Sequence, residues 1–268
     1  MKIYFLYIII IGCLYLLLFM LYFKIVIYFE RIKLFMSKTT FKGSAMLNPV
    51  PVVLIASKNN EGLSNIFTVA WAGTICTNPP MISISIRKNR LSYEYINETK
   101  EFTLNMPSYS LVKQTDFCGV TSGRDVDKIK EMKFTMKDSV NINAPYIDEC
   151  SISLECKVKQ IVELGTHDLF MAEVLSSHVD NSIIDESGKI HFEKANLMCY
   201  CHGEYYPMNK DAIGKFGFSV VKNKNLKSKY SIYDTNFEKL TNPSENKHNK
   251  KAHKKQNTKP FKKISKNK

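Results

Sequence analysis

The sequence predicts a mainly β protein in which antiparallel strands form a barrel, with a few short helices at its periphery. Several stretches alternate apolar and polar residues, as half-buried strands do, and they follow one another with little helix between them. No G-x-G-x-x-G or Walker sequence occurs, so the chain offers no support for a dinucleotide-binding, doubly wound sheet. These observations favour an antiparallel barrel.

The first 35 residues form a hydrophobic N-terminal segment. Ile3 to Phe23 is an uncharged run of 21 residues, which is long enough to cross a bilayer as a helix. Three basic residues follow the run and only Lys2 precedes it, so a membrane span would leave the following domain in the cytoplasm. A cleaved signal peptide is less favoured, because no small-residue cleavage site ends the apolar run.

The net charge of +13 is concentrated at the two ends of the chain. Residues 1–35 carry +3, residues 222–268 carry +12 from fifteen lysines and three acidic residues, and the body between them carries −2. The basic charge therefore says nothing about the function of the folded body. We predict that residues 221–268 form a largely disordered tail, and the tail lacks the interleaved aromatic residues that would favour specific nucleic-acid binding.

The seven cysteines include no C-x-x-C pair, which argues against a disulfide scaffold and for a reducing compartment. Cys199-Tyr200-Cys201-His202 is the one cluster with metal-binding residue types. Alternation along a strand places both thiols on one face, where small apolar side chains are ordinary core residues. We therefore predict no metal site.

The stretch from Asn65 to Met106 organises the rest of the chain. Phe67–Ala72 and Met81–Ile86 have the composition of strands, and Asn78-Pro79-Pro80 interrupts them. Arg87, Lys88, Arg90 and Ser92 follow the second strand, and residues 93–99 have helical spacing. Cations, a hydroxyl and free N–H groups at a helix start together indicate a phosphate site.

Further strands and helices are predicted on both sides of the central stretch. Before the central stretch, residues 52–57 read as a strand. After it, residues 111–118 and 128–132 read as helices, and Thr121 to Asp125 forms the turn that leads into the second. Strands are predicted at 150–163 and 169–179, with His167 in the turn between them, and a last strand at 197–206.

The central stretch carries an extended pattern, N-x-x-T-x-A-W-x-G-T followed by P-P-x-x-x-I-S-I-R-x-x-R-x-S-Y-E and E-F-x-x-N-x-P. It resembles the flavin reductase-like family of FMN-binding split barrels, in particular its flavoredoxin branch. S-G-R-D-V-D-K-I and G-T-H-D-L-F-M-A-E-V extend the likeness, which covers Met46 to Ser219. The resemblance implies a Greek-key split β-barrel over residues 36–220. Members of this family start about a dozen residues before an N-P-x-P strand, so translation from Met36 is an alternative to a membrane anchor.

The resemblance also implies FMN as the cofactor and assigns roles to particular residues. Arg87, Arg90, Ser92 and Lys128 would hold the phosphate through charge-assisted hydrogen bonds. Trp71 would give the ring a flat apolar wall. His167, the single candidate catalytic residue, would place a nicotinamide or hydrogen-bond the flavin. The full set of predicted cofactor-binding residues is Asn65, Thr68, Ala70, Trp71, Gly73, Thr74, Arg87, Arg90, Ser92, Lys128 and His167.

Three functions remain open at this point. The first is an NAD(P)H-dependent flavin reductase that passes hydride from a nicotinamide to FMN. The second is a flavoredoxin-type FMN electron carrier reduced by a redox protein partner, and the third is a membrane-tethered split barrel that binds another ligand such as haem. The resemblance further implies a homodimer, and the predicted location is cytoplasmic, with membrane contact through residues 1–35 if these are translated.

Overall fold

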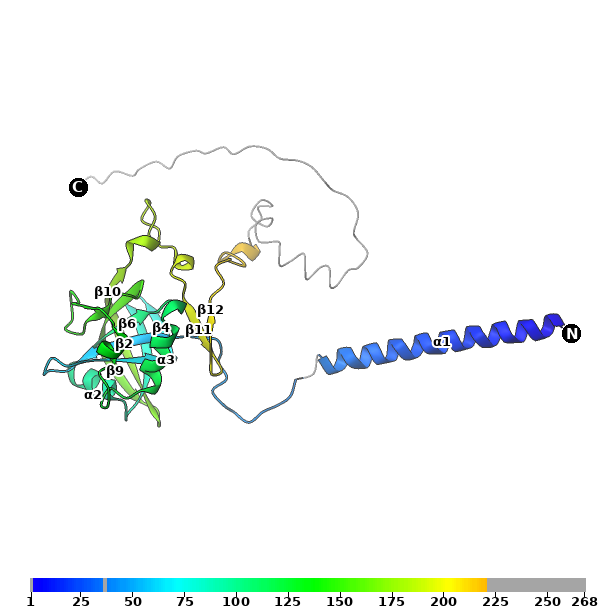
Figure 1. Ribbon diagram of the computed structural model, residues 1–268, viewed down its shortest axis with the longest axis horizontal. Coiled ribbons are helices and arrows are strands. Elements are labelled where there is room, and N and C mark those ends of the chain that lie inside the picture. The colour runs from blue at the N-terminus through cyan, green and yellow to red at the C-terminus, as the bar shows by residue number, and fades with distance from the viewer. Residues whose placement is uncertain (1, 36–37, 221–268) are drawn as a thin grey trace. The chain divides into compact units, whose positions relative to one another are not determined.

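The computed structural model describes residues 2–35 and 38–220. The chain divides into two compact units, and the boundary along the sequence lies between Leu47 and Asn48. The predicted tail, residues 221–268, and the alternative start at Met36 lie outside the described residues. The first unit is dominated by α1 (Lys2–Phe35), the blue helix in Figure 1. Within α1, residues 11–29 are long and apolar enough to cross a membrane, judged by length and composition. Membrane contact stays a prediction.

The second unit is built on a seven-stranded antiparallel sheet (Figure 1). The strand order is β3-β2-β6-β9-β10-β5-β4. The connection from β5 to β6 passes over the β9–β10 pair, which is a Greek-key arrangement. The bounds of the strands are β2 (Val53–Lys58), β3 (Ser64–Val69), β4 (Ala72–Thr77), β5 (Pro80–Arg87), β6 (Glu101–Met106), β9 (Ile152–Glu163) and β10 (His167–Val179).

The two edge strands of this sheet, β3 and β4, are consecutive in the chain. Only Ala70 and Trp71 separate them, so the two edges must come together at this corner. The Trp71 carbonyl accepts a hydrogen bond from the Ser85 N–H at 2.9 Å, which fixes the corner against β5. The sheet therefore curls into a barrel, and the predicted mainly β, antiparallel barrel is confirmed.

Two smaller sheets complete the unit. One contains β1 (Val50–Pro51), β11 (Met198–Cys201) and β12 (Glu204–Pro207), and the other pairs β7 (Met136–Lys137) with β8 (Tyr146–Ile147). The prediction of one continuous strand at 197–206 is wrong, because the chain reverses at His202 and Gly203. Both have positive φ angles, 50° and 98°, as a tight hairpin turn requires.

Two strand boundaries also differ from the predictions. The expected strand at 67–72 spans the corner between β3 and β4, because the chain turns at Ala70 and Trp71. His167 was expected in a turn, but it is the first residue of β10 and pairs with Arg87 of β5. The turn between β9 and β10 is shorter than the sequence Gly165-Thr166-His167-Asp168 suggests, because His167 and Asp168 already pair with β5.

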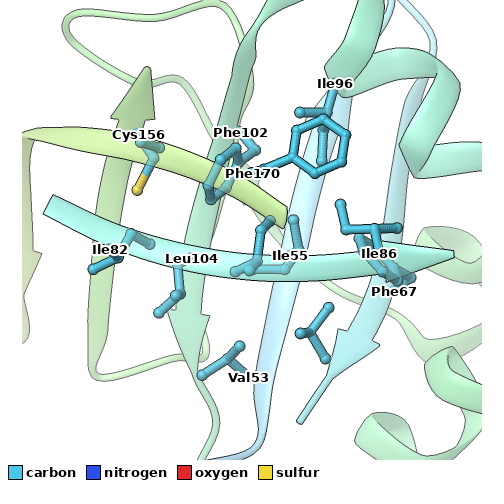
Figure 2. Packing of buried hydrophobic residues seen from close by; sticks show 13 residues of the cluster. Val53, Ile55, Phe67, Ile82, Ile86, Ile96, Phe102, Leu104, Cys156 and Phe170 are labelled. Carbon is cyan, nitrogen blue, oxygen red and sulfur yellow. The ribbon is translucent and has the colours of Figure 1, made fainter. Parts of the chain in front are cut away.

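The helices cover parts of the sheet and lie close to their predicted positions. They are α2 (Leu91–Thr99), α3 (Val112–Val120) and α4 (Lys128–Met132), with single 3₁₀ turns at Tyr109–Leu111, Asn181–Ile183, Phe192–Lys194 and Phe218–Val220. The main core lies inside the curled sheet, where Ile55, Phe102 and Phe170 are fully buried (Figure 2). A second core packs α3 and α4 against the other face of β2, so residues 53–57 of β2 are all buried.

Candidate functional site

Two adjoining cavities lie where β3, the β5–α2 turn and the segment after α3 meet. One has a volume of about 350 Å³ and aromatic walls, and the other has a volume of about 200 Å³ and cationic walls. Phe67 and Arg90 line both. We call them the ring cavity and the phosphate cavity, and they bring together nine of the eleven predicted site residues.

The phosphate cavity is held together by a hydrogen bond between two residues that are 27 positions apart. Asn65 of β3 donates from Nδ2 to the Ser92 hydroxyl of α2 at 2.8 Å, and both side chains are buried. Ser92 stands in the first turn of α2, where a helix leaves backbone N–H groups without intrahelical partners. The strand and the helix start are therefore fixed against each other.

Lys128 of α4 is the most buried cation in the described part of the chain, with 3% of its surface exposed. Its Nζ donates to the Cys118 carbonyl at 3.1 Å and to the Thr121 carbonyl at 3.3 Å, both at the end of α3. Burial, with a smaller contribution from the neighbouring positive charge of Arg90, lowers the pKa of this ammonium to about 8.

The charge of the phosphate cavity is not balanced by protein. Among the described residues that line it, none is a carboxylate, and the Arg90 guanidinium makes no hydrogen bond or ion pair to a described residue. Burying an unpaired cation is costly, so the cavity favours an anion. An anion placed beside Lys128 would restore the charged form of the amine.

Gly123 forms part of the wall of the phosphate cavity. A Cβ atom built on it would lie 2.1 Å from Asn65 Oδ1, a distance that no side chain tolerates. The adjacent Arg124 pairs with Glu94 of α2 and donates from Nη1 to the Asn89 carbonyl at 3.1 Å. The loop of residues 121–124 is thus fastened directly onto the start of α2.

Trp71 and His167 both line the ring cavity. Trp71 lies at the corner between β3 and β4, and His167 is the first residue of β10. Their ring centroids are 5.5 Å apart with an interplanar angle of 57°. The Arg87 Nε lies 3.4 Å from His167 Nε2, and Thr166 Oγ1 lies 2.9 Å from His167 Nδ1. Burial and then the charge of Arg87 lower the pKa of His167, which favours the neutral imidazole.

Other side chains that line the ring cavity lie outside the predicted set of site residues, and three of them are Tyr200, Tyr205 and Asp116. Tyr200 and Tyr205 contact each other edge to face with centroids 5.6 Å apart, and the Tyr205 hydroxyl donates to Asp116 Oδ1 at 3.0 Å. Burial and the bond to Asp116 raise the pKa of Tyr205. The hairpin turn at His202-Gly203 was the signal that could have placed both tyrosines on one face.

The remaining predicted residues divide into two groups. Thr68 and Ala70 line the ring cavity, but the Thr68 hydroxyl already donates to the Thr115 carbonyl, so it is not free as a donor. Gly73 and Thr74 line neither cavity. They lie exposed on β4, paired with Ser83 and Ile82 of β5, and their part in binding stays a prediction.

The paired cavities fit FMN, which joins a planar ring system to a terminal phosphate. A phosphate dianion matches the uncompensated cations Lys128 and Arg90 and the hydroxyl of Ser92. The ring cavity offers aromatic side chains with a neutral imidazole at its edge. Among residues 2–35 and 38–220, no group of three or more His, Cys, Asp or Glu side chains could hold a metal ion.

Comparisons with known proteins agree with this geometry. The family described as flavin reductase like domain matches residues 46–209. An uncharacterized protein of Archaeoglobus fulgidus is 29% identical over 163 residues, which cover 61% of this chain and 90% of that protein.

Two solved flavoredoxins share the fold along nearly their whole length. The flavoredoxin of Desulfovibrio vulgaris (Miyazaki F) has a TM-score of 0.64 and 28% identity, and the alignment covers 68% of this chain and 98% of that one. The flavoredoxin from Methanosarcina acetivorans has a TM-score of 0.62 and 27% identity, with 71% and 99% covered. The chain belongs to the flavin reductase-like family and has its FMN-binding split-barrel fold.

Proposed function

We propose that the protein is an FMN-dependent oxidoreductase that passes hydride from NADH or NADPH to FMN. The observation that carries this proposal is the junction of the two cavities at Phe67 and Arg90. It provides cations for a terminal phosphate next to a cavity with aromatic walls. FMN, when bound, supplies a ring that accepts a hydride.

Each side chain then has a defined task. Lys128, Arg90 and Ser92 bind the phosphate, and Asn65 orients the Ser92 hydroxyl. Trp71 and His167 form one wall of the ring cavity, and Tyr200 with Tyr205 forms another. Hydride transfer itself needs no acid–base pair, so a neutral His167 is suited to hydrogen-bonding or positioning rather than to proton transfer.

The experiment is an absorbance spectrum of the full-length protein in mild detergent, recorded before and after anaerobic addition of NADH and of NADPH. The proposal expects flavin absorption that bleaches within seconds with one of the nucleotides. Flavin absorption that persists with both nucleotides would contradict the reductase. A haem spectrum, or no flavin uptake from added FMN, would instead favour a split barrel that binds another ligand.

A second candidate function is an FMN electron carrier reduced by a redox protein. The observation in its favour is the likeness to two flavoredoxins over nearly their entire length. Trp71, on the wall of the ring cavity, is 52% exposed, so a protein partner could approach the ring directly. Persistent flavin absorption with both nucleotides, but bleaching by a reduced redox protein, would establish the carrier.

We also propose that the protein is a homodimer that contacts the membrane on the cytoplasmic side. Support for the dimer comes from the edge strand β4, where Ile75 is 45% exposed and the outer edge is unpaired by described residues. Support for membrane contact comes from the apolar span of α1. Light scattering of the detergent-solubilised protein, and membrane fractionation of cells with and without residues 1–35, test the two statements separately.

A further inference from the structure

The first turn of α2 is tied to the sheet on two sides by consecutive residues. On one side, Ser92 accepts the hydrogen bond of Asn65 from β3. On the other side, the Tyr93 hydroxyl donates to Asp168 Oδ2 of β10 at 2.7 Å. Neighbouring side chains on a helix point about 100° apart, so the two bonds reach different strands. The turn that carries Arg90 and Ser92 is therefore held from two directions.

Asp168 is a buried carboxylate with an incomplete set of hydrogen bonds. Its side chain is 1% exposed, and Oδ1 has no hydrogen-bond partner among the described residues. The Lys88 ammonium lies 3.6 Å from Oδ1, but it is half exposed and closer to Glu163 Oε2, at 3.1 Å. Burying a carboxylate is costly unless hydrogen bonds compensate. Breaking the bond from Tyr93 would leave none from a described residue to this carboxylate, so Tyr93 is held firmly on β10.

The start of β10 serves both parts of the site. Side chains alternate along a strand, so His167 and Asp168 lie on opposite faces. His167 lines the ring cavity. Asp168 and Phe170 lie on the buried face. The Tyr93 ring packs edge to face against Phe170, with centroids 5.4 Å apart. Two adjacent residues of β10 thus connect the ring cavity to the helix start at the phosphate cavity.

We propose that the Tyr93–Asp168 hydrogen bond sets the position of the phosphate cavity relative to the ring cavity, so that both parts of one flavin are bound at once. The inference rests on the proposed flavin site, and it makes Tyr93 and Asp168 positioning residues. Neither side chain lines the ring cavity or the phosphate cavity. Their effect on binding must therefore pass through the residues of the α2 start that do, Arg90 and Ser92.

The test compares FMN with riboflavin, which has the same ring and no phosphate. Dissociation constants are measured by flavin fluorescence quenching on the flavin-free, full-length protein in mild detergent. Wild type is expected to bind FMN at least about tenfold more tightly than riboflavin, because charge-assisted hydrogen bonds hold the phosphate. Tyr93→Phe should weaken FMN binding about fivefold and leave riboflavin binding within about twofold of wild type, since only the phosphate ligands are displaced.

Asp168→Ala separates positioning from charge. Removing a negative charge near the site favours an anion, so a role of Asp168 through its charge predicts tighter FMN binding in this variant. The positioning role predicts the opposite sign, which is weaker FMN binding with riboflavin binding unchanged. The double variant with Tyr93→Phe should lose no more than Tyr93→Phe alone, because both changes break one interaction.

Tyr95→Phe is the matched control, because Tyr95 lies on the same helix and its hydroxyl makes no hydrogen bond to a described residue. It should leave the binding of both flavins unchanged. An unchanged preference for FMN in Tyr93→Phe, an equal loss of both flavins, or tighter FMN binding in Asp168→Ala would overturn the inference. Wild type that binds FMN no more tightly than riboflavin, or binds neither, would overturn the proposed flavin site itself, which is a separate result.

Discussion

The two cavities of the site differ in how firmly the protein holds their walls. In the phosphate cavity Lys128 and Ser92 are buried, and hydrogen bonds fix the positions of both. In the ring cavity Trp71 is 52% exposed and Arg87 is also exposed, with only a 3.4 Å contact to His167. We infer that the phosphate cavity sets the affinity for FMN and that the ring cavity sets access to the ring.

The largest expected effect is at Lys128. Lys128→Met should weaken FMN binding roughly 30-fold, since a hydrogen bond to a charged group contributes about 2 kcal/mol. Methionine keeps most of the apolar length of the side chain, and circular dichroism checks the fold. Isothermal titration with FMN measures the loss, and Lys130→Met, an exposed change on the same helix, is the control. An affinity within twofold of wild type would remove Lys128 from the phosphate site.

The next effect is a dependence of FMN affinity on pH. The pKa of Lys128 is about 8 without ligand, and a bound phosphate dianion raises it. Binding is therefore strongest below pH 8 and weakens as the pH rises, by about tenfold between pH 7 and pH 9. The phosphate stays a dianion over this range, because its second pKa is about 6. Titrations at several pH values should show this decline in wild type and a flat profile in Lys128→Met. A decline that persists in the variant would assign the titration to another group.

The smallest effect is expected at Arg87, on the ring side. Arg87→Ala should weaken FMN binding only about threefold, because Arg87 is exposed and an exposed charge contributes little to binding. The same change should raise the pKa of His167, since the charge of Arg87 is one of its two lowering causes. NMR titration of the imidazole measures that shift, with Lys88→Ala as the control. A loss of affinity as large as that in Lys128→Met would break the distinction between the two cavities.

Much of the fold was predictable because strand alternation is a local property. The apolar positions of β5 and β9 repeat every second residue, and the cations after β5 mark the strand end. The boundaries near the site were less predictable. His167 joins β10 only because Arg87 is available as a pairing partner 80 residues away. The tyrosines of the last hairpin were missed because one strand was predicted where two short ones form.

Taken alone, the sequence determined the antiparallel class, the family and the residue types of a phosphate site, because these depend on spacing and composition along the chain. Tertiary structure decided which of those residues meet. It buries Lys128 against the end of α3, brings Asn65 to Ser92 and leaves Gly73 and Thr74 on an exposed strand. Such contacts depend on register between distant segments, and local sequence carries no information about register until the strands pair.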